Sequence, residues 1–187
     1  MDLDMSVDLV RLSKTVSHAL RHEPEAYGIA LDANGWAGVD ELLAAIGRAV
    51  PKLAGATEAD LRQILATSDK QRFEIADGRV RARYGHSLVQ QIEHPETESV
   101  PAVLYHGTPV QSAEVVARDG LRPMARQRVH LSGTVELAAR VGARRGRPVV
   151  FAIDTARARA EGVRFSRVDD DVFLADRIPG ALRRIEG

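Results

Sequence analysis

The spacing of apolar residues predicts a helix near the start of the chain. Leu9, Leu12, Val16 and Leu20 recur at helical spacing and define one apolar face. Pro24 disfavours helical geometry at the residue before it, so we expect the helix to end just before this proline.

Two cationic side chains, Arg21 and His22, follow the apolar stripe at the predicted helix end. Cations are favourable there because the carbonyl end of a helix carries partial negative charge. Taken alone, the pair is explained by this capping chemistry.

The rest of the first half predicts two more helices and a hairpin. Helical spacing recurs over 39–46 and again after a capping box at 57–60. Two β-like runs, 72–75 and 79–82, flank Asp77-Gly78, which is a strong hairpin turn signal. Three helices closed by a hairpin are typical of a winged-helix module.

The second half has a different pattern, dominated by short strands. Residues 93–100 are polar and contain a proline, so we interpret them as the boundary between domains 1–93 and 94–187. The predicted strands cover 103–105, 129–131, 149–153, 163–165 and 172–174, and the predicted helices cover 112–118 and 134–141. The fold class is therefore α+β.

Composition restricts the possible functions. The chain has 187 residues, 44% of them hydrophobic, which is enough for one domain or two small ones with real cores. Lys+Arg and Asp+Glu both number 26, so any polyanion must be bound by a local patch. Without cysteine there is no disulfide, thiolate nucleophile or Cys-ligated zinc. No signal core or membrane-length apolar run is present, so we expect a soluble, cytoplasmic protein.

Arginines are the first candidates for chemistry. Lys70-Gln71-Arg72 opens the predicted hairpin, and Arg144 lies in the arginine-rich loop 143–148. The planar guanidinium fork matches phosphate oxygens and stays charged. Together, Arg21, Arg72 and Arg144 would form a site for a dianionic phosphate. The alternative is that they are solvated surface arginines.

Several common catalytic motifs are missing. The sequence contains no Walker loop, dinucleotide fingerprint, HExxH or DxD metal cluster, and no serine in a nucleophile-elbow setting. We therefore predict no metal site. A phosphate reaction here would depend on electrostatic stabilisation by arginines and on proton transfer by a histidine such as His22.

The second half supplies neutral polar groups at strand ends. One group is Tyr105-His106-Gly107-Thr108, and the other comprises His130 and Ser132 on the next predicted strand. A glycine beside a strand end permits close backbone approach to a ligand. Histidine with threonine or serine could hydrogen-bond a ribose or an amide. A strand-ending turn and a core histidine explain the same residues equally well.

Taken together, these motifs resemble the KptA-type RNA 2′-phosphotransferases. In the first half the resemblance rests on Leu12-Ser13-Lys14, Leu20–Pro24, Leu31–Trp36, Asp69–Phe73 and Arg81–Ser87. In the second half it rests on Leu104–Thr108, Arg126–Ser132, Arg144–Val150 and Asp176–Pro179. The motifs follow the family order over roughly Arg11 to Pro179.

This resemblance implies a winged-helix N-terminal lobe and a C-terminal lobe of ADP-ribosyltransferase type that holds NAD⁺. The family moves an internal RNA 2′-phosphate to NAD⁺, which is consumed, and releases nicotinamide and ADP-ribose 1″,2″-cyclic phosphate. Its known role is removal of a tRNA splice-junction phosphate. The implied partners are therefore a 2′-phosphorylated RNA and NAD⁺.

The resemblance also assigns residues. The catalytic Arg-His-Arg-Arg set falls on Arg21, His22, Arg72 and Arg144, and the NAD⁺ groove would be lined by His106, Gly107, Thr108, His130 and Ser132. Arg145 stands where the family commonly has a histidine. Val172 stands where protein-modifying relatives have a glutamate, which weighs against protein modification. Two alternatives remain: ADP-ribosylation of phosphorylated nucleic-acid ends, and non-catalytic nucleic-acid binding.

Overall fold

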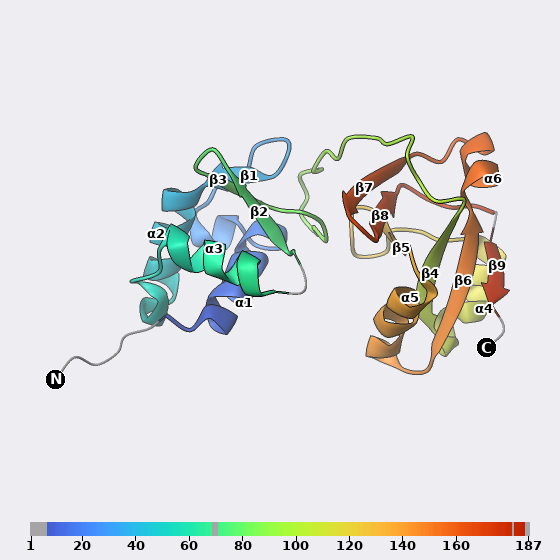
Figure 1. The fold of residues 1–187 in the computed structure, drawn as a ribbon, viewed down its shortest axis with the longest axis horizontal. Coiled ribbons are helices and arrows are strands. Elements are labelled where there is room, and N and C mark those ends of the chain that lie inside the picture. The colour runs from blue at the N-terminus through green and yellow to red at the C-terminus, as the bar shows by residue number, and fades with distance from the viewer. Residues whose placement is uncertain (1–6, 69–70, 181, 186–187) are drawn as a thin grey trace. The chain divides into compact units, whose positions relative to one another are not determined.

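The computed structural model describes residues 7–68, 71–180 and 182–185. The chain falls into two compact units, Met1–Glu93 and His94–Gly187, and each is described by itself (Figure 1). The first unit combines helices with a small sheet, and the second is built on a six-stranded antiparallel sheet. The predicted α+β class is confirmed.

The first unit begins with the predicted helix, α1 (Leu9–Arg21). Asp8 is its N-cap, and its carboxylate accepts a hydrogen bond from the Arg11 backbone N–H at 2.9 Å. His22 is the C-cap. Of the predicted apolar stripe, Leu12, Val16 and Leu20 are buried and Leu9 is partly buried, and Ala19 joins them on the buried face.

Two more helices and a three-stranded sheet complete this unit. The elements are β1 (Trp36–Gly38), α2 (Val39–Ala49), α3 (Glu58–Thr67), β2 (Phe73–Ala76), β3 (Arg79–Ala82) and the short 3₁₀ turns Glu25–Tyr27 and Pro51–Leu53. The strand order is β1-β3-β2. The capping box is confirmed, since the side chains of Thr57 and Asp60 each accept from the other's backbone N–H.

The predicted hairpin between β2 and β3 is confirmed. Asp77 and Gly78 have positive φ angles of 50° and 70°, as a tight turn with left-handed central residues requires. The two strands pair from Phe73 opposite Ala82 to Ala76 opposite Arg79. Strand β1 was not predicted, because three residues are too few to show alternation.

The second unit is organised around a six-stranded sheet with the strand order β7-β8-β5-β4-β6-β9 (Figure 1). Every neighbouring pair of strands is antiparallel. Its strands are β4 (Val103–Pro109), β5 (Val129–Ser132), β6 (Pro148–Asp154), β7 (Phe165–Asp169), β8 (Val172–Ala175) and β9 (Leu182–Ile185). Its helices are α4 (Val110–Asp119), α5 (Val135–Gly142) and α6 (Thr155–Ala160), and a 3₁₀ turn, η3 (Ala143–Arg145), follows α5.

One predicted strand is displaced and two elements were missed. The sequence predicts a strand over 163–165, but β7 begins at Phe165, because Gly162 (φ 84°) and Val163 close the turn after α6. The Val163 N–H donates to the Ala158 carbonyl at 3.0 Å. Helix α6 and strand β9 were not predicted.

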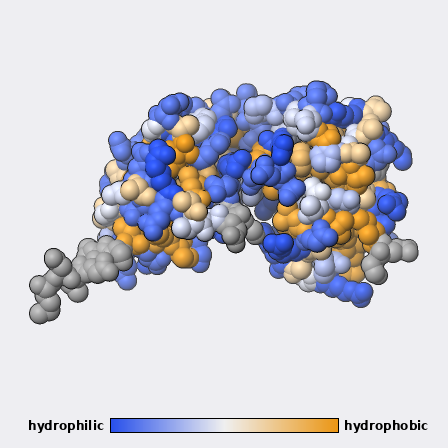
Figure 2. All heavy atoms as spheres, viewed as in Figure 1, coloured by the Kyte–Doolittle hydropathy of each residue, from blue (hydrophilic) through white to orange (hydrophobic). Residues whose placement is uncertain are grey.

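Apolar side chains form separate cores in the two units. The first core is centred on α1, α2 and α3, and the second lies against the large sheet. Hydrophilic residues cover much of the face seen in Figure 2, with apolar residues visible between them. No helix within the described residues is long and apolar enough to cross a membrane.

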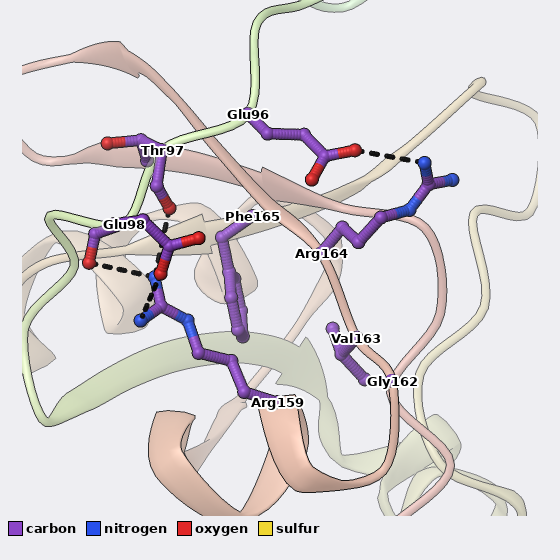
Figure 3. A pocket seen from close by; sticks show the side chains of 8 residues that line it. All are labelled: Glu96, Thr97, Glu98, Arg159, Gly162, Val163, Arg164 and Phe165. Atoms are coloured by element: carbon purple, nitrogen blue, oxygen red, sulfur yellow. Dashed lines mark hydrogen bonds and ion pairs between the residues drawn. The ribbon is translucent and has the colours of Figure 1, made fainter.

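Residues 94–100, which read as a linker in the sequence, pack onto the second unit. Arg159 Nη2, from α6, donates to the carbonyls of Thr97 at 2.9 Å and Glu98 at 2.8 Å. The Thr97 N–H donates to the Phe165 carbonyl at 2.8 Å. A cavity of about 300 Å³ lies beside the segment, and Figure 3 shows its polar lining groups paired with one another.

Candidate functional site

Three of the four predicted catalytic residues lie together in the first unit. Arg21 and His22 end α1, and Arg72 directly precedes β2. The Arg21 Nη2 donates to the backbone carbonyl of Arg72 at 2.7 Å, which ties the helix end to the start of the hairpin. Lys70, named with Arg72 in the sequence motif, lies outside the described residues.

Residues 84–87, which follow the hairpin, pack against the C-terminal end of α1. The Ser87 N–H donates to the Arg21 carbonyl at 2.9 Å. The Arg21 guanidinium lies 5.3 Å from the ring centroid of Tyr84, within cation–π range. Gly85 has φ 90° and packs beside the Arg21 side chain. These contacts fix both the backbone and the side chain of Arg21.

The same segment orients His22. The His22 Nδ1 and the Ser87 Oγ are 2.8 Å apart, a hydrogen-bond distance. A hydroxyl can both donate and accept, so it can bond this nitrogen whether or not the nitrogen carries a proton. Ser87 therefore holds the ring in place without adding a charge. Sequence reasoning missed this role, although Ser87 ends the Gly85-His86-Ser87 motif.

Arg72 keeps its charge available. Its Nη1 lies 3.3 Å from the hydroxyl of Ser13, which is nearly buried on α1. Ser13 is neutral, and no ion pair involves Arg72 among the residues that the structure describes. A guanidinium in this state suits an anionic ligand.

The fourth predicted catalytic residue, Arg144, lies in the second unit. It is exposed on η3, directly after α5. Its predicted convergence with the other three residues stays a prediction.

The predicted NAD⁺-binding residues lie on the two central strands of the second unit, β4 and β5. These strands share the single register pair Tyr105 and Ser132, whereas β4 pairs with β6 from Val103 to Pro109. The ladder between β4 and β5 is therefore limited to this pair, and we call the remaining stretch between these two strands the opening.

Each of the two predicted groove histidines bonds a backbone carbonyl, and the bond made by His106 links β4 to β5. His106 Nδ1 is 2.9 Å from the His130 carbonyl, and His130 Nδ1 is 3.1 Å from the Arg128 carbonyl. A carbonyl can only accept, so both Nδ1 atoms carry the proton. In the neutral rings, Nε2 is then an acceptor, as a ribose hydroxyl or an amide N–H requires.

Gly107 packs closely against a helix, and its predicted place in the NAD⁺ groove stays a prediction. A Cβ added there would lie 1.8 Å from the Ala138 carbonyl oxygen and 3.0 Å from the Gly142 nitrogen, both on α5. The missing side chain therefore makes room for a helix, which lies over β4 and β6 in Figure 1. Sequence reasoning had connected this glycine with ligand approach, because helix packing across thirty residues leaves no local signal.

The predicted groove residues lie on two opposite faces of the sheet, because side chains alternate along a strand. Gly107 faces α5, so its neighbours His106 and Thr108 point to the opposite face of β4. Ser132 pairs with Tyr105, on the same face as Gly107, and His130 shares that face with Ser132. Thr108 and Ser132 are only 6% and 8% exposed. A ligand that used all five residues would therefore have to enter the opening between the strands.

Burial lowers the pKa of His106, and the nearby positive charge of Arg126 lowers it further, against the raising effect of the bond to the His130 carbonyl. The folded protein therefore binds a proton at His106 less readily than the unfolded chain does. Stability from this group is fully present above the unfolded pKa of about 6.5 and is lost as pH falls below that value.

We accordingly expect the free energy of unfolding to fall more steeply in the wild type than in a His106→Asn variant between about pH 6.5 and about pH 5. Asparagine can still donate to the His130 carbonyl but does not titrate. Denaturant unfolding at several pH values measures both slopes, and the comparison cancels the other histidines. Equal slopes in the two proteins would contradict the assignment.

The side chains predicted to line the groove are hydroxyls and imidazoles. Within the described residues, no group of three or more His, Asp or Glu side chains gathers as metal ligands would. The predicted groove residues comprise the hydroxyls of Thr108 and Ser132 and the imidazoles of His106 and His130, which β4 and β5 present on both faces of the sheet. These groups suit the ribose hydroxyls and the carboxamide of NAD⁺.

Comparison with known proteins agrees with this chemistry. The family model described as "RNA 2'-phosphotransferase, Tpt1 / KptA family" matches residues 7–177. A protein of Acetivibrio thermocellus is 42% identical over 181 residues, covering 96% of this chain and 98% of its own. One from Agrobacterium fabrum is 44% identical over 169 residues, covering 89% of each chain. One from Streptomyces griseus is 40% identical over 187 residues, covering 95% and 97%. Each is named a probable RNA 2′-phosphotransferase. The chain belongs to the Tpt1/KptA family of RNA 2′-phosphotransferases.

Proposed function

We propose that this chain, as an enzyme of that family, transfers an internal 2′-phosphate of RNA to NAD⁺ through Arg21, His22, Arg72 and Arg144. The observation that carries the residue assignment is the first-unit cluster, in which Arg21 contacts Arg72 and Ser87 contacts His22. This cluster combines two guanidinium groups with one group that titrates near neutral pH. Such a set suits phosphate binding and proton transfer at one place.

The reaction proceeds in two steps. In the first, a 2′-phosphate oxygen bonds to the nicotinamide-bearing ribose carbon, and nicotinamide leaves with the electrons of its C–N bond. In the second, the neighbouring 2″-hydroxyl attacks phosphorus, and the bond from phosphorus to the RNA 2′-oxygen breaks. The products are RNA with a 2′-hydroxyl and ADP-ribose 1″,2″-cyclic phosphate.

Each residue has a distinct task in this proposal. The guanidinium groups of Arg21 and Arg72 hold the phosphate oxygens, and Arg144 stabilises charge as the phosphoryl group moves. His22 transfers a proton in the second step, where a hydroxyl becomes a nucleophile and an RNA oxygen leaves. Ser87 orients the His22 ring through Nδ1.

Each unit binds one of the two substrates in this proposal. The first unit, 1–93, acts as a winged-helix lobe that takes the RNA phosphate, and its three helices and hairpin support this role. The second unit, 94–187, acts as an ADP-ribosyltransferase-like lobe that holds NAD⁺. The opening between β4 and β5, with its hydroxyls and imidazoles, supports that role. A tRNA splice-junction phosphate is the proposed natural target.

The decisive experiment combines the protein, NAD⁺ and an RNA oligonucleotide with one internal 2′-phosphate, and identifies the products by mass. We expect 2′-hydroxyl RNA, nicotinamide and ADP-ribose cyclic phosphate. ADP-ribose left on the RNA as the final product would instead indicate an enzyme that modifies phosphorylated nucleic acid. If the 2′-phosphate causes no nicotinamide release, only the nucleic-acid-binding function remains.

An Arg144→Ala variant tests the contribution of the second unit. Removing one well-placed charged donor at a transition state typically costs a few kcal/mol, so turnover of a 2′-phosphorylated trinucleotide should fall at least roughly a hundredfold. Arg118→Ala is the matched control, because Arg118 is also exposed but pairs with Asp119 at 2.8 Å. A near-normal rate for Arg144→Ala contradicts the assignment, and a loss confined to Arg145→Ala would move it by one residue.

A further inference from the structure

Four exposed arginines crowd into the stretch from α5 to β6. They are Arg140, Arg144, Arg145 and Arg147, and they lie within residues 137–153, which contain no acidic residue. Among the residues that the structure describes, none of the four forms an ion pair. We call Arg140, Arg145 and Arg147 the arginine patch, since Arg144 already has a catalytic assignment.

Three other exposed arginines of the second unit each pair with a nearby acidic side chain. Arg118 bonds Asp119 at 2.8 Å, Arg157 bonds Glu161 at 3.2 Å and Arg167 bonds Asp170 at 3.2 Å. The protein as a whole has a formal net charge of zero. Among the described residues of this unit, Arg122, Arg177 and Arg183 are also exposed without an ion pair, but they are far apart in the sequence. Four such arginines within residues 140–147 concentrate positive charge locally, as a polyanion site in a neutral protein requires.

The backbone brings these side chains close together. Gly142 and Ala143 both have right-handed helical angles, so the helical path continues from α5 into η3. Arg140 and Arg144, four residues apart along that path, therefore lie one turn apart on the same side. Gly146, with φ 130°, then turns the chain into β6 and follows Arg145 directly.

The end of a helix favours cations, which explains part of this placement. It does not explain four arginines without an acidic partner, because neighbouring like charges repel one another. A bound polyanion would offset that repulsion. Guanidinium groups bind phosphate through paired donors and remain charged at all relevant pH values.

We propose that the arginine patch binds the phosphodiester backbone of the RNA, outside the nucleotide that carries the 2′-phosphate. This inference rests on the proposed function, in which Arg144 acts on the reacting phosphate. An RNA strand that reaches Arg144 passes beside Arg140, Arg145 and Arg147, since they flank it in the same turn of the chain. The contacts read charge and not sequence, so the patch would bind RNA of any sequence.

The test uses the full chain with Arg140, Arg145 and Arg147 all changed to glutamine. Two substrates are compared: a 2′-phosphorylated trinucleotide and a single-stranded RNA of about twenty nucleotides with one internal 2′-phosphate. We expect the wild type to show a lower KM for the longer RNA, and the variant to lose roughly tenfold of that advantage. The slope of log KM against log salt concentration for the longer RNA should also shrink by about 2, or about 0.7 for each lost phosphate contact.

A matched control changes Arg118, Arg157 and Arg167 to glutamine, which removes the same charge from paired arginines of the same unit. An equal loss in this control would overturn the proposal, because net charge would explain it. So would an unchanged KM for the longer RNA, or a rise confined to the KM for NAD⁺, which would assign the patch to the NAD⁺ diphosphate. Thermal melting identifies a misfolded triple variant, and the single Arg147→Gln change then takes its place in the same assay.

The outcome is separable from the proposed function. If the wild type turns over the trinucleotide but the patch variant treats both RNAs as the wild type does, only this inference fails. If the wild type releases no nicotinamide with either RNA, the proposed function itself fails.

Discussion

A His22→Ala variant should still release nicotinamide but should no longer complete the transfer. The first step uses a phosphate that is already anionic and needs no proton removed, whereas the second step needs one moved. General acid–base catalysis contributes roughly a hundredfold or more, so formation of the cyclic phosphate should slow at least that much. RNA that carries both the phosphate and ADP-ribose should accumulate, and the mass of the RNA measures it directly.

Ser87 provides the comparison that separates orientation from chemistry. Ser87→Ala removes the hydroxyl 2.8 Å from His22 Nδ1 and should slow the same second step by roughly tenfold, because small misplacements of a catalytic group are costly. Ser87→Thr keeps a hydroxyl and should recover most of the rate. Undiminished cyclic phosphate formation by His22→Ala would refute the role of the histidine. A normal Ser87→Ala with an impaired His22→Ala would refute only the orienting contact.

The largest effect on stability should come from Gly107→Ala. The new methyl group would lie 1.8 Å from the Ala138 carbonyl oxygen, and this oxygen belongs to a helix backbone that cannot move alone. We expect the free energy of unfolding to fall by about 3 kcal/mol or more, at the upper end of overpacking effects. Urea unfolding of the protein without substrates measures this loss.

Gly55→Ala is a suitable control, because an added Cβ there meets nothing within 4 Å and the residue has no positive φ. Its effect should stay within roughly half a kcal/mol. A Gly107→Ala protein of normal stability that binds NAD⁺ poorly would instead restore the original interpretation, in which this glycine admits a ligand.

Local signals in the sequence predicted local structure correctly. The Asp77-Gly78 turn and the Thr57–Asp60 capping box depend on residues close together in the chain, and both were confirmed. The stripe from Leu12 to Leu20 likewise identified the buried face of α1.

Elements defined by distant partners escaped prediction. Strand β9, with two arginines between apolar ends, becomes a strand by pairing with β6. Helix α6 has six residues in which alanine and arginine alternate, a pattern that suggests a strand. Asp154 favours the helix, because its carboxylate caps the Arg157 N–H at 2.9 Å.

The candidate site divides in the same way. Arg21, His22 and Arg72 could be predicted because the sequence contains the family motifs that carry them. The structure adds the contacts that these residues make. The partners of these residues could not be foreseen. Ser87 meets His22 across sixty-five residues, and Gly107 meets α5 through a helix whose position no local pattern encodes.

The segment 94–100 is held mainly through its backbone, which determines the sequence changes that it can tolerate. Arg159 bonds the carbonyls of Thr97 and Glu98, and the Thr97 N–H bonds another carbonyl, groups that almost every residue type supplies. The side-chain ion pairs of Glu96 with Arg164 and of Glu98 with Arg159 are exposed and contribute little, so most substitutions here should cost little stability. An inserted or deleted residue would shift every carbonyl out of register with Arg159, so selection should act on the length of this segment and hardly on its composition.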